Sequence, residues 1–330
     1  MRGLLERRLL FVTGKGGVGK STIAAALGLL AASRNKRALV CETEPRGALC
    51  AAFECTATRF EPIEVSPRLF AMSMDTEASL REYLKLNLRV PTVGRIGPVA
   101  RAFDFVATAA PGVREILTVG KLCYEVRERH YDLVVVDASA TGHIVGELAA
   151  PVGINELVRV GAVRSQTDWM LEILSDPDQT GVCVVATPEE TPVTEAIELA
   201  GRLEPETGVH LAAVIANRVL PELFGRSEEE TFEALAAPAG RRRLLAAYAA
   251  VSGVAVGAAD PSAGDALGAV LDAARLATRV RRSGAEHLAR LAAALPDQVP
   301  LVHLPYLFGR SHGPRAIRQI AETLAEELGE

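Results

Sequence analysis

The chain has 330 residues, of which 49% are hydrophobic and 23% charged, and its formal net charge is −5. This length and composition allow one large or two ordinary domains with a substantial core. The acidic balance, without a block of basic residues, argues against a nucleic-acid-binding surface. No apolar run of about 18 residues is free of charge, and the first residues lead into a predicted strand rather than a signal peptide. We therefore expect a cytosolic protein without stable membrane insertion.

A glycine-rich segment, Thr13–Thr22, lies between an apolar run and a helix-forming stretch. Leu9–Val12 is typical of a buried strand, and Ile23–Ser33 is typical of a helix. Glycines allow successive backbone N–H groups to surround an anion, and the start of a helix adds partial positive charge. The segment therefore predicts a P-loop, in which Lys20 contacts the β- and γ-phosphates of a nucleotide and Ser21 holds Mg²⁺. The alternative is a flexible glycine turn with solvated lysines.

Strands and helices alternate through the next part of the chain. The predicted elements are a strand over Arg37–Cys41, a loop over Glu42–Gly47, a strand over Leu69–Met74, a helix over Thr76–Leu86, and mostly helical structure over residues 95–130 with a break at Pro111-Gly112. The last of these stretches carries no chemical motif.

A fully apolar run, Leu133–Val136, ends in the carboxylate of Asp137. Such a run is typical of a strand in a parallel sheet, and ligands bind at the carboxyl ends of these strands. Asp137 is therefore predicted to support the Mg²⁺ shell, although an aspartate after a strand is often only a helix cap. The small-residue loop that follows, Ala138–His143, contains a glycine hinge able to respond to the γ-phosphate.

The second half of the chain adds further strands and a helical insertion. Its predicted elements are strands over Gly181–Ala186 and His210–Ala216, a helical hairpin over residues 226–295 with a break at Val251–Gly264, a strand over Val299–Leu304 and a helix over Pro314–Leu328. Asn217 follows the second of these strands, and its amide is suited to reading an adenine edge, or it simply forms a loop. Residues 1–330 thus predict a single α/β domain, a parallel-sheet P-loop NTPase core flanked by helices. An inserted α-helical subdomain is contributed by residues 76–130 and 226–295.

The loop Gly14–Thr22 has an extra lysine, Lys15, and resembles the deviant Walker A motif of the SIMIBI class of P-loop proteins. Within that class the chain resembles the family of arsenite-pump ATPases and of targeting ATPases for tail-anchored membrane proteins, and especially its actinobacterial paralogues labelled anion-transporting ATPases. The matching residues are Glu44-Pro45 with Leu49 and Phe53 in switch I, Asp137 with Thr141-Gly142-His143 in switch II, Pro111-Gly112 with Glu115 in the helical region, and Asn217 with Pro305–Gly313 in the adenine-binding segments.

This resemblance implies a dimer with two nucleotides near its interface. Lys15 of each subunit would reach the phosphates of the other subunit, although by itself it is also compatible with a solvated surface lysine. Asp137 would support Mg²⁺ together with Ser21, and Glu44 would orient the attacking water. ATP would contact Gly16, Gly17, Val18, Gly19, Lys20, Ser21, Thr22, Asn217, Pro305 and Tyr306.

Three features depart from the family pattern. The switch I residue that positions water is aspartate in the family, whereas Glu44 has one more methylene group and is also compatible with a loop carboxylate or a helix cap. The five cysteines form no Cys-x-x-Cys pair, so we expect no zinc clip at a dimer interface. Cys50 and Cys55 are the only close pair and lie outside the family's metalloid-binding positions, so we expect no stimulation by arsenite.

The sequence therefore predicts a cytosolic Mg²⁺-dependent ATPase that acts as a nucleotide-switched dimer and handles membrane-protein or other hydrophobic clients. The main alternative is a weakly hydrolysing regulatory subunit that pairs with a homologous ATPase. A positioning ATPase of the chromosome- or septum-partitioning kind is disfavoured, because the sequence has no basic DNA-binding surface or C-terminal membrane helix. A nitrogenase-reductase-like electron carrier is excluded, because Asp137–His143 contains no cysteine to ligate a cluster.

Overall fold

The computed structural model describes residues 3–88, 112–157, 160–252, 261–309 and 313–329, and within them a central sheet of eight strands. The order is β3-β4-β2-β5-β1-β6-β7-β8, and every neighbouring pair is parallel except β3 and β4. The strands are β1 (Leu9–Gly14), β2 (Ala38–Glu42), β3 (Ile63–Ser66), β4 (Leu69–Ser73), β5 (Leu133–Asp137), β6 (Thr180–Ala186), β7 (Leu211–Val219) and β8 (Leu301–Pro305). This mostly parallel sheet confirms the predicted α/β core.

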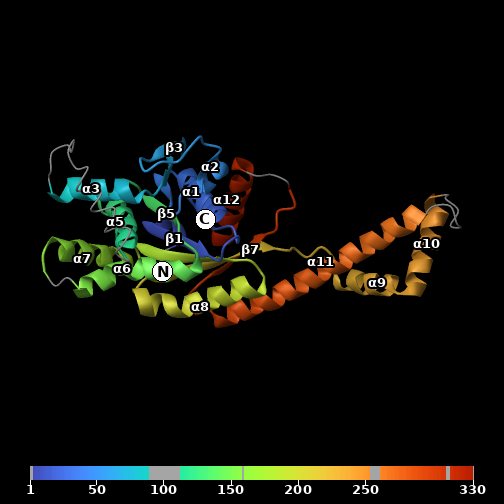
Figure 1. Ribbon diagram of the computed structural model, residues 1–330. Coiled ribbons are helices and arrows are strands. Elements are labelled where there is room, and N and C mark those ends of the chain that lie inside the picture. Colours follow the sequence, from blue (N-terminus) through green and yellow to red (C-terminus); the bar gives the residue numbers. More distant parts are fainter. Residues whose placement is uncertain (1–2, 89–111, 158–159, 253–260, 310–312, 330) are drawn as a thin grey trace.

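Helices cover both faces of the sheet (Figure 1). They are α1 (Lys20–Ser33), α2 (Ala48–Phe53), α3 (Thr76–Leu88), α5 (Val113–Arg127), α6 (Thr141–Leu157), α7 (Ala162–Ser175), α8 (Glu190–Thr207), α9 (Arg226–Ala236), α10 (Pro238–Ser252), α11 (Pro261–Ala294) and α12 (Pro314–Leu328), with a 3-10 turn at Leu4–Glu6. Leu10 and Val12 pack in the cluster that contains α1 and α12, whereas Leu9 and Phe11 pack in the cluster that contains α5 to α8. Burial on both faces explains why these strands are apolar throughout.

Strand register brings the predicted site residues together. β1 lies between β5 and β6, so the loop that follows β1 is central in the sheet. Val12 is paired with Asp137, and Asp137 is paired with Glu42 on β2. The carboxyl ends of three adjacent strands therefore place two acidic side chains beside the glycine loop, which is where an open α/β sheet binds its ligands.

Most predicted elements are present within three residues of their predicted bounds, and β5 and α12 agree at both ends. Strand β3 was not predicted, because it is a four-residue edge strand whose residues are only partly buried. Helix α2 was not predicted either. The loop predicted over Ala138–His143 is shorter than expected, because α6 already begins at Thr141.

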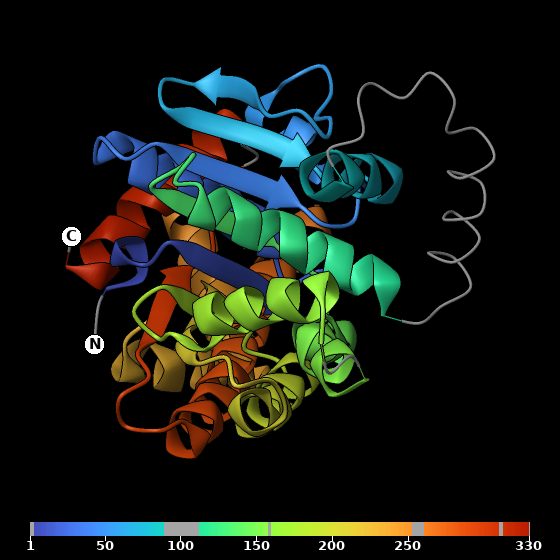
Figure 2. The same cartoon turned by 90° about the vertical axis from the view of Figure 1, so that its left-hand side faces the viewer.

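The helical insertion differs from the predicted hairpin. Its described residues form three helices, because Pro238 begins α10 one residue after α9 ends, and proline is favoured in the first turn of a helix. The predicted break at Val251–Gly264 lies partly in residues 253–260, outside the described residues. We call α9, α10 and α11 the arm: α9, α10 and the first part of α11 project from the sheet in Figure 1 and lie behind it in Figure 2, whereas the last turns of α11 pack against α8 and the core.

The two segments predicted to form one helical subdomain lie at opposite ends of the molecule (Figure 1). Helices α3 and α5 are at one end, and the arm extends from the other. We therefore treat them as two separate helical regions. Residues 89–111, including the whole helical stretch predicted before Pro111-Gly112, lie outside the described residues. No helix within the described ranges is long and apolar enough to cross a membrane.

Candidate functional site

The loop between β1 and α1 has a backbone that favours glycine at two critical positions. Gly14 (φ 151°) and Gly19 (φ 101°) have positive φ, and Gly19 directly precedes α1. A Cβ atom at Gly14 would lie 2.2 Å from the carbonyl oxygen of Val185 on β6. Gly16 and Gly17 are exposed. The N-terminus of a 14-residue helix thus lies beside accessible glycine backbone, which is the arrangement that an anion-binding loop needs.

Asn217, near the end of β7, supports this loop. Its Nδ2 donates a hydrogen bond to the carbonyl oxygen of Val18 at 2.8 Å, and its Oδ1 accepts from the backbone N–H of Arg218 at 3.0 Å. A Cβ atom at Gly19 would lie 2.5 Å from Nδ2, so the close contact also requires glycine there. The amide of Asn217 thus fixes the loop in this structure, and contact with adenine stays a prediction.

Lys20, Ser21 and Asp137 form the polar group under the loop. Asp137 is 7% exposed, and Ser21 lies beside it. Burial raises the pKa of Asp137 to about 6, although the neighbouring Ser21 side chain and the charge of Lys20 oppose this shift. Burial also lowers the pKa of Lys20, against the charge of Asp137. A hydroxyl and a carboxylate side by side fit Mg²⁺, which takes oxygen ligands from protein, phosphate and water.

Lys15 is held by a residue of the same chain that the sequence analysis did not single out. Its Nζ lies 2.5 Å from Oε1 of Glu195 on α8, and Oε2 of Glu195 accepts a hydrogen bond from Thr141 Oγ1 at 2.6 Å. A cavity of about 450 Å³ lies beside Lys15 and is lined also by Gly16, Gly17 and Arg218, among others. Lys15 is therefore neither a free surface lysine nor a group beneath the loop.

The loop predicted as switch I is organised by Glu42, which is 1% exposed. Its Oε1 accepts hydrogen bonds from the backbone N–H groups of Arg46 at 2.9 Å and Ala48 at 3.0 Å, and its Oε2 accepts from Ser73 Oγ at 3.1 Å. Glu44 projects from this loop and forms an ion pair with Arg46, with Oε2 2.6 Å from Nη2. Its catalytic role stays a prediction, because in this arrangement the carboxylate is engaged by a neighbouring cation.

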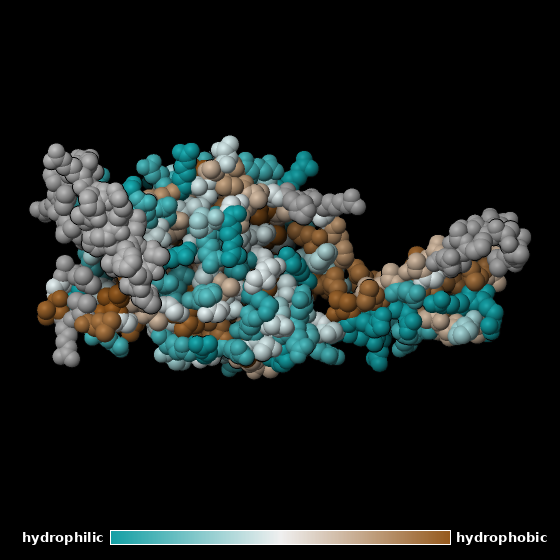
Figure 3. Space-filling view, in the orientation of Figure 1, coloured by the Kyte–Doolittle hydropathy of each residue, from teal (hydrophilic) through white to brown (hydrophobic). Residues whose placement is uncertain are grey.

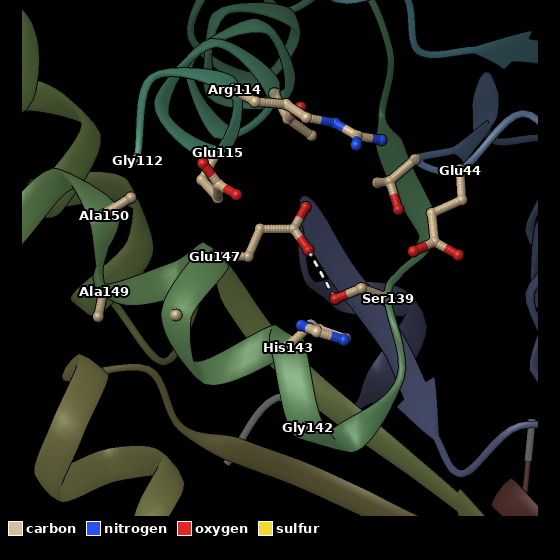
Figure 4. Close-up of a pocket in the computed structure, with 13 residues that line it drawn as sticks. Glu44, Gly112, Arg114, Glu115, Ser139, Gly142, His143, Glu147, Ala149 and Ala150 are labelled. Carbon is tan, nitrogen blue, oxygen red and sulfur yellow. Dashed lines mark hydrogen bonds between the residues drawn. The ribbon is translucent and has the colours of Figure 1, made fainter. Parts of the chain in front are cut away.

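A second cavity, of about 550 Å³, lies next to Glu44 between the start of α5 and the first turns of α6 (Figure 4). Figure 4 shows Glu115 and Glu147 near one another at this cavity, with the Glu147 carboxylate directed toward Ser139 and with His143 below it. Arg114 adds a positive charge to the wall. The cavity therefore joins the switch I carboxylate to the helical end of the molecule that carries α3 and α5.

Glu147 connects this cavity to the P-loop. Its Oε2 accepts a hydrogen bond from Ser139 Oγ at 2.9 Å, and the carbonyl oxygen of Ser139 accepts from Thr13 Oγ1 at 2.7 Å. Burial raises the pKa of Glu147, although the Ser139 hydrogen bond opposes this, and nearby Glu115 adds to the rise. Movement of the loop after β5 would thus change the hydrogen bond of Ser139 to Thr13 in the glycine loop and its hydrogen bond to Glu147 at the cavity.

The predicted adenine-binding segment after β8 is only partly described. Pro305 ends β8, and the N–H of Tyr306 donates to the carbonyl oxygen of Val219 at 2.8 Å. This bond places the segment beside the end of β7, two residues beyond Asn217. Residues 310–312 lie outside the described residues, and the contact of Pro305 and Tyr306 with a base stays a prediction.

Comparison with known proteins decides the family. The sequence pattern of the anion-transporting ATPase family matches residues 7–165 and 155–236, which together contain the glycine loop, the two segments predicted as switches and Asn217. The chain belongs to the anion-transporting ATPase family. This confirms the family expected from the loop and the switch motifs, and it supports the predicted class, ATP hydrolase.

Several relatives of this anion-transporting ATPase family member carry ATPase names. ATPase BagA of Mycobacterium tuberculosis is 32% identical over 225 residues, which cover 65% of this chain and 66% of BagA. A putative arsenical pump-driving ATPase of Halobacterium salinarum is 30% identical over 242 residues, covering 67% of this chain and 37% of the relative. ATPase get3 of Neurospora crassa is 28% identical over 171 residues, covering 50% of each. The chain thus spans less than two thirds of the length of these relatives.

The structure gathers Lys20, Ser21, Asp137 and the loop glycines into one site, with Glu44 and Lys15 at its margins. The residues that the sequence analysis missed are Thr13, Glu42, Ser139, Glu147 and Glu195, all polar side chains that act on the backbone or on other side chains. One sequence signal was available for Glu42, since it ends an apolar strand as Asp137 does. No spacing rule in the sequence connects Glu195 to Lys15, because the two are 180 residues apart.

Proposed function

We propose that this chain is a Mg²⁺-dependent ATPase that acts as a nucleotide-switched dimer. The observation that carries the proposal is the fixed glycine loop with Lys20, Ser21 and Asp137 gathered beneath it. Membership of the anion-transporting ATPase family and relatives named as ATPases support it.

Each residue group would have a distinct task. The backbone of Gly16–Thr22 binds the phosphates, and Lys20 contacts the β- and γ-phosphates. Ser21 and Asp137 hold Mg²⁺, which when bound neutralises charge on the phosphate oxygens. Glu44 orients the attacking water once its carboxylate leaves Arg46. These tasks are positioning and electrostatic stabilisation, which are the main requirements of phosphoryl transfer.

The dimer is supported by the place of Lys15. Its side chain is 37% exposed at the edge of the P-loop, so it is accessible to a second subunit without rearrangement of the loop. A cation from the partner near the transferred phosphoryl group would stabilise charge in the transition state. The proposed switch is thus the approach of two subunits around nucleotide.

A hydrophobic client is the finer part of this proposal. Leu157, at the end of α6, is 84% exposed, and Val160, close to the start of α7, is 82% exposed. Figure 3 shows apolar side chains at that end of the molecule. Exposed apolar surface of this kind is typical of an interaction site. We propose that nucleotide-driven movement of α6 alters this surface.

Turnover measured against protein concentration tests the proposal. We expect phosphate release from ATP to require Mg²⁺, to stop in EDTA, and to rise per subunit as concentration drives association. Turnover that is independent of concentration would contradict the dimer, and no turnover at any concentration would contradict the ATPase.

A second candidate function is a weakly hydrolysing subunit that regulates a homologous ATPase. The pairing of Glu44 with Arg46 favours it, because the longer carboxylate is not free to orient water in this arrangement. Turnover of the chain alone and in a mixture with a homologous ATPase distinguishes the two. This candidate predicts that the chain alone binds ATP but hydrolyses it at a rate raised several-fold only in the mixture.

A further inference from the structure

One carboxylate on α8 joins two segments on which the proposed function depends. Glu195 lies in the second turn of α8 and accepts from Lys15 through Oε1 and from Thr141 through Oε2. Lys15 belongs to the P-loop, and Thr141 is the first residue of α6, directly after the loop that follows Asp137. A single side chain therefore links the P-loop, switch II and α8 within one subunit.

The contact competes with the task proposed for Lys15. To reach phosphates held by another subunit in the proposed dimer, the ammonium group of Lys15 would leave Glu195, from which it now lies 2.5 Å away. Thr141 strengthens the contact of Lys15 with Glu195, because its hydrogen bond at 2.6 Å fixes the orientation of the Glu195 carboxylate. Movement of switch II would therefore weaken the hold on Lys15.

We propose that Glu195 is a positioning residue that keeps Lys15 against its own subunit until a nucleotide-bound partner draws it away. This inference rests on the proposed function. In this inference, Glu195 on α8 determines how readily two subunits close around nucleotide. It does so only through Lys15.

The contact between Lys15 and Glu195 is weak enough to form and break reversibly. The side chains of Lys15 and Glu195 are 37% and 30% exposed, and ion pairs that remain accessible to water shift an equilibrium by no more than about fivefold. A phosphate chain offers several negative charges, so it can displace Glu195. The hydrogen bond from Lys15, and then that from Thr141, lowers the pKa of Glu195. The carboxylate is therefore charged at neutral pH and available to hold Lys15 again.

Substitution of Glu195 by glutamine tests the inference through association. Glu195→Gln keeps the shape and an acceptor for Thr141 but removes the charge that attracts Lys15. In sedimentation velocity with Mg²⁺ and the non-hydrolysable analogue AMPPNP, we expect half-maximal association at a two- to fivefold lower protein concentration than for the wild-type chain. Glu198→Gln is the matched control, because Glu198 is exposed on the same helix, and it should leave this concentration unchanged.

A second measurement tests the contact without a dimer. In the nucleotide-free monomer, we expect an amine-reactive acetylating reagent to label Lys15 several-fold faster in Glu195→Gln than in the wild-type chain. Labelling of exposed Lys85, read by peptide mass spectrometry in the same sample, should not change. A structural role for Glu195 would not produce this selective change.

The outcomes separate the inference from the proposed function. A wild-type chain that associates with AMPPNP, together with a Glu195→Gln chain that associates at the same or a higher concentration, overturns the inference alone. Unchanged labelling of Lys15 also overturns it alone. A wild-type chain that stays monomeric at every AMPPNP concentration overturns the proposed dimer and the inference with it.

Discussion

The sheet and the arm are held together by different forces. All six residues of β1 are buried, and apolar side chains contact it from both faces. Helix α9 of the arm has no buried residue. It is joined to α11 by ion pairs at its surface, including Arg275 with Glu233 at 3.1 Å and Arg282 with Glu229.

This difference indicates where precise geometry is available. A fully buried large apolar side chain contributes roughly 1.5–3 kcal/mol, whereas an exposed ion pair contributes ~0.2–1 kcal/mol and is screened by salt. The sheet can therefore hold the P-loop and Asp137 in fixed positions. Helix α9 has no such burial, so we expect substitutions in the two regions to have effects of different size and kind.

The largest effect should come from the sheet side, at Lys20. We expect Lys20→Ala to lower ATP affinity about 100-fold or more, because a charge that contacts phosphate in a partly buried site has no replacement. Isothermal titration calorimetry measures this change. Lys85→Ala, an exposed lysine on α3, is the control and should bind as the wild-type chain does. Tight ATP binding by Lys20→Ala would contradict the assignment of the P-loop.

Glu44→Gln should separate binding from turnover. We expect hydrolysis to slow roughly 100-fold with ATP affinity nearly unchanged, because the amide cannot accept a proton from the attacking water. Single-turnover phosphate release and calorimetry on the same sample provide both values. Glu61→Gln, an exposed residue outside the site, should leave both unchanged. Unchanged turnover in Glu44→Gln would remove Glu44 from the mechanism.

Asp137→Asn should stabilise the nucleotide-free chain at high pH. The raised pKa of Asp137, about 6 against 3.8, means that burial of its charge lowers stability above pH 6, and that this cost disappears as the pH falls toward 4. A difference of about two pKa units corresponds to ~3 kcal/mol at most. In urea denaturation at pH 8, the variant should therefore have the higher free energy of unfolding. At pH 4 the free energies of unfolding of the two chains should be nearly equal.

Asp297→Asn, an exposed residue after α11, is the matched control and should show no such pH-dependent gain. The pH dependence is the decisive observation. A gain of the same size at pH 8 and pH 4 would show that the charge of Asp137 is not its cause.

The smallest effects should come from the arm. We expect Arg275→Ala and Arg282→Ala each to increase deuterium exchange of α9 amides by a few-fold at most, because each removes one ion pair whose arginine is accessible to water. Salt at 1 M should increase α9 exchange in the wild-type chain as well, since the Debye length is then about 3 Å. Exchange in β1 should not change in either experiment.

Arg279→Ala, an exposed arginine on α11 for which the structure describes no ion pair, is the control for these variants. Equal exchange of α9 in all three variants and the wild-type chain would show that the ion pairs do not hold the arm.

The sequence predicted those parts of the site that depend on local chemistry. The glycines between strand and helix specify the backbone conformation of the loop. A fully apolar strand is expected in the buried part of a parallel sheet, with Asp137 at its carboxyl end. The hydrogen bond from Asn217 to Val18 spans 199 residues, and the one from Thr141 to Glu195 spans 54. Contacts of this kind depend on how helices and strands pack, so no local pattern could have predicted them.

In the arm, the sequence predicted the type of element but not the number or the position of the helices. Its composition predicted helices correctly. The number of helices was wrong because of Pro238, a residue type that usually breaks helices but here begins α10. Its place relative to α3 and α5 could not be predicted either, because composition carries no information about which end of a sheet a helical segment covers.

The most direct test of the account is a crystal structure of the chain grown with Mg²⁺ and AMPPNP. We predict phosphate oxygens within hydrogen-bond distance of the backbone N–H groups of Gly16–Thr22 and of Lys20, with Mg²⁺ between Ser21, Asp137 and the nucleotide. Analogue bound elsewhere, with the glycine loop in contact only with solvent, would contradict the central claim that this loop is the nucleotide site.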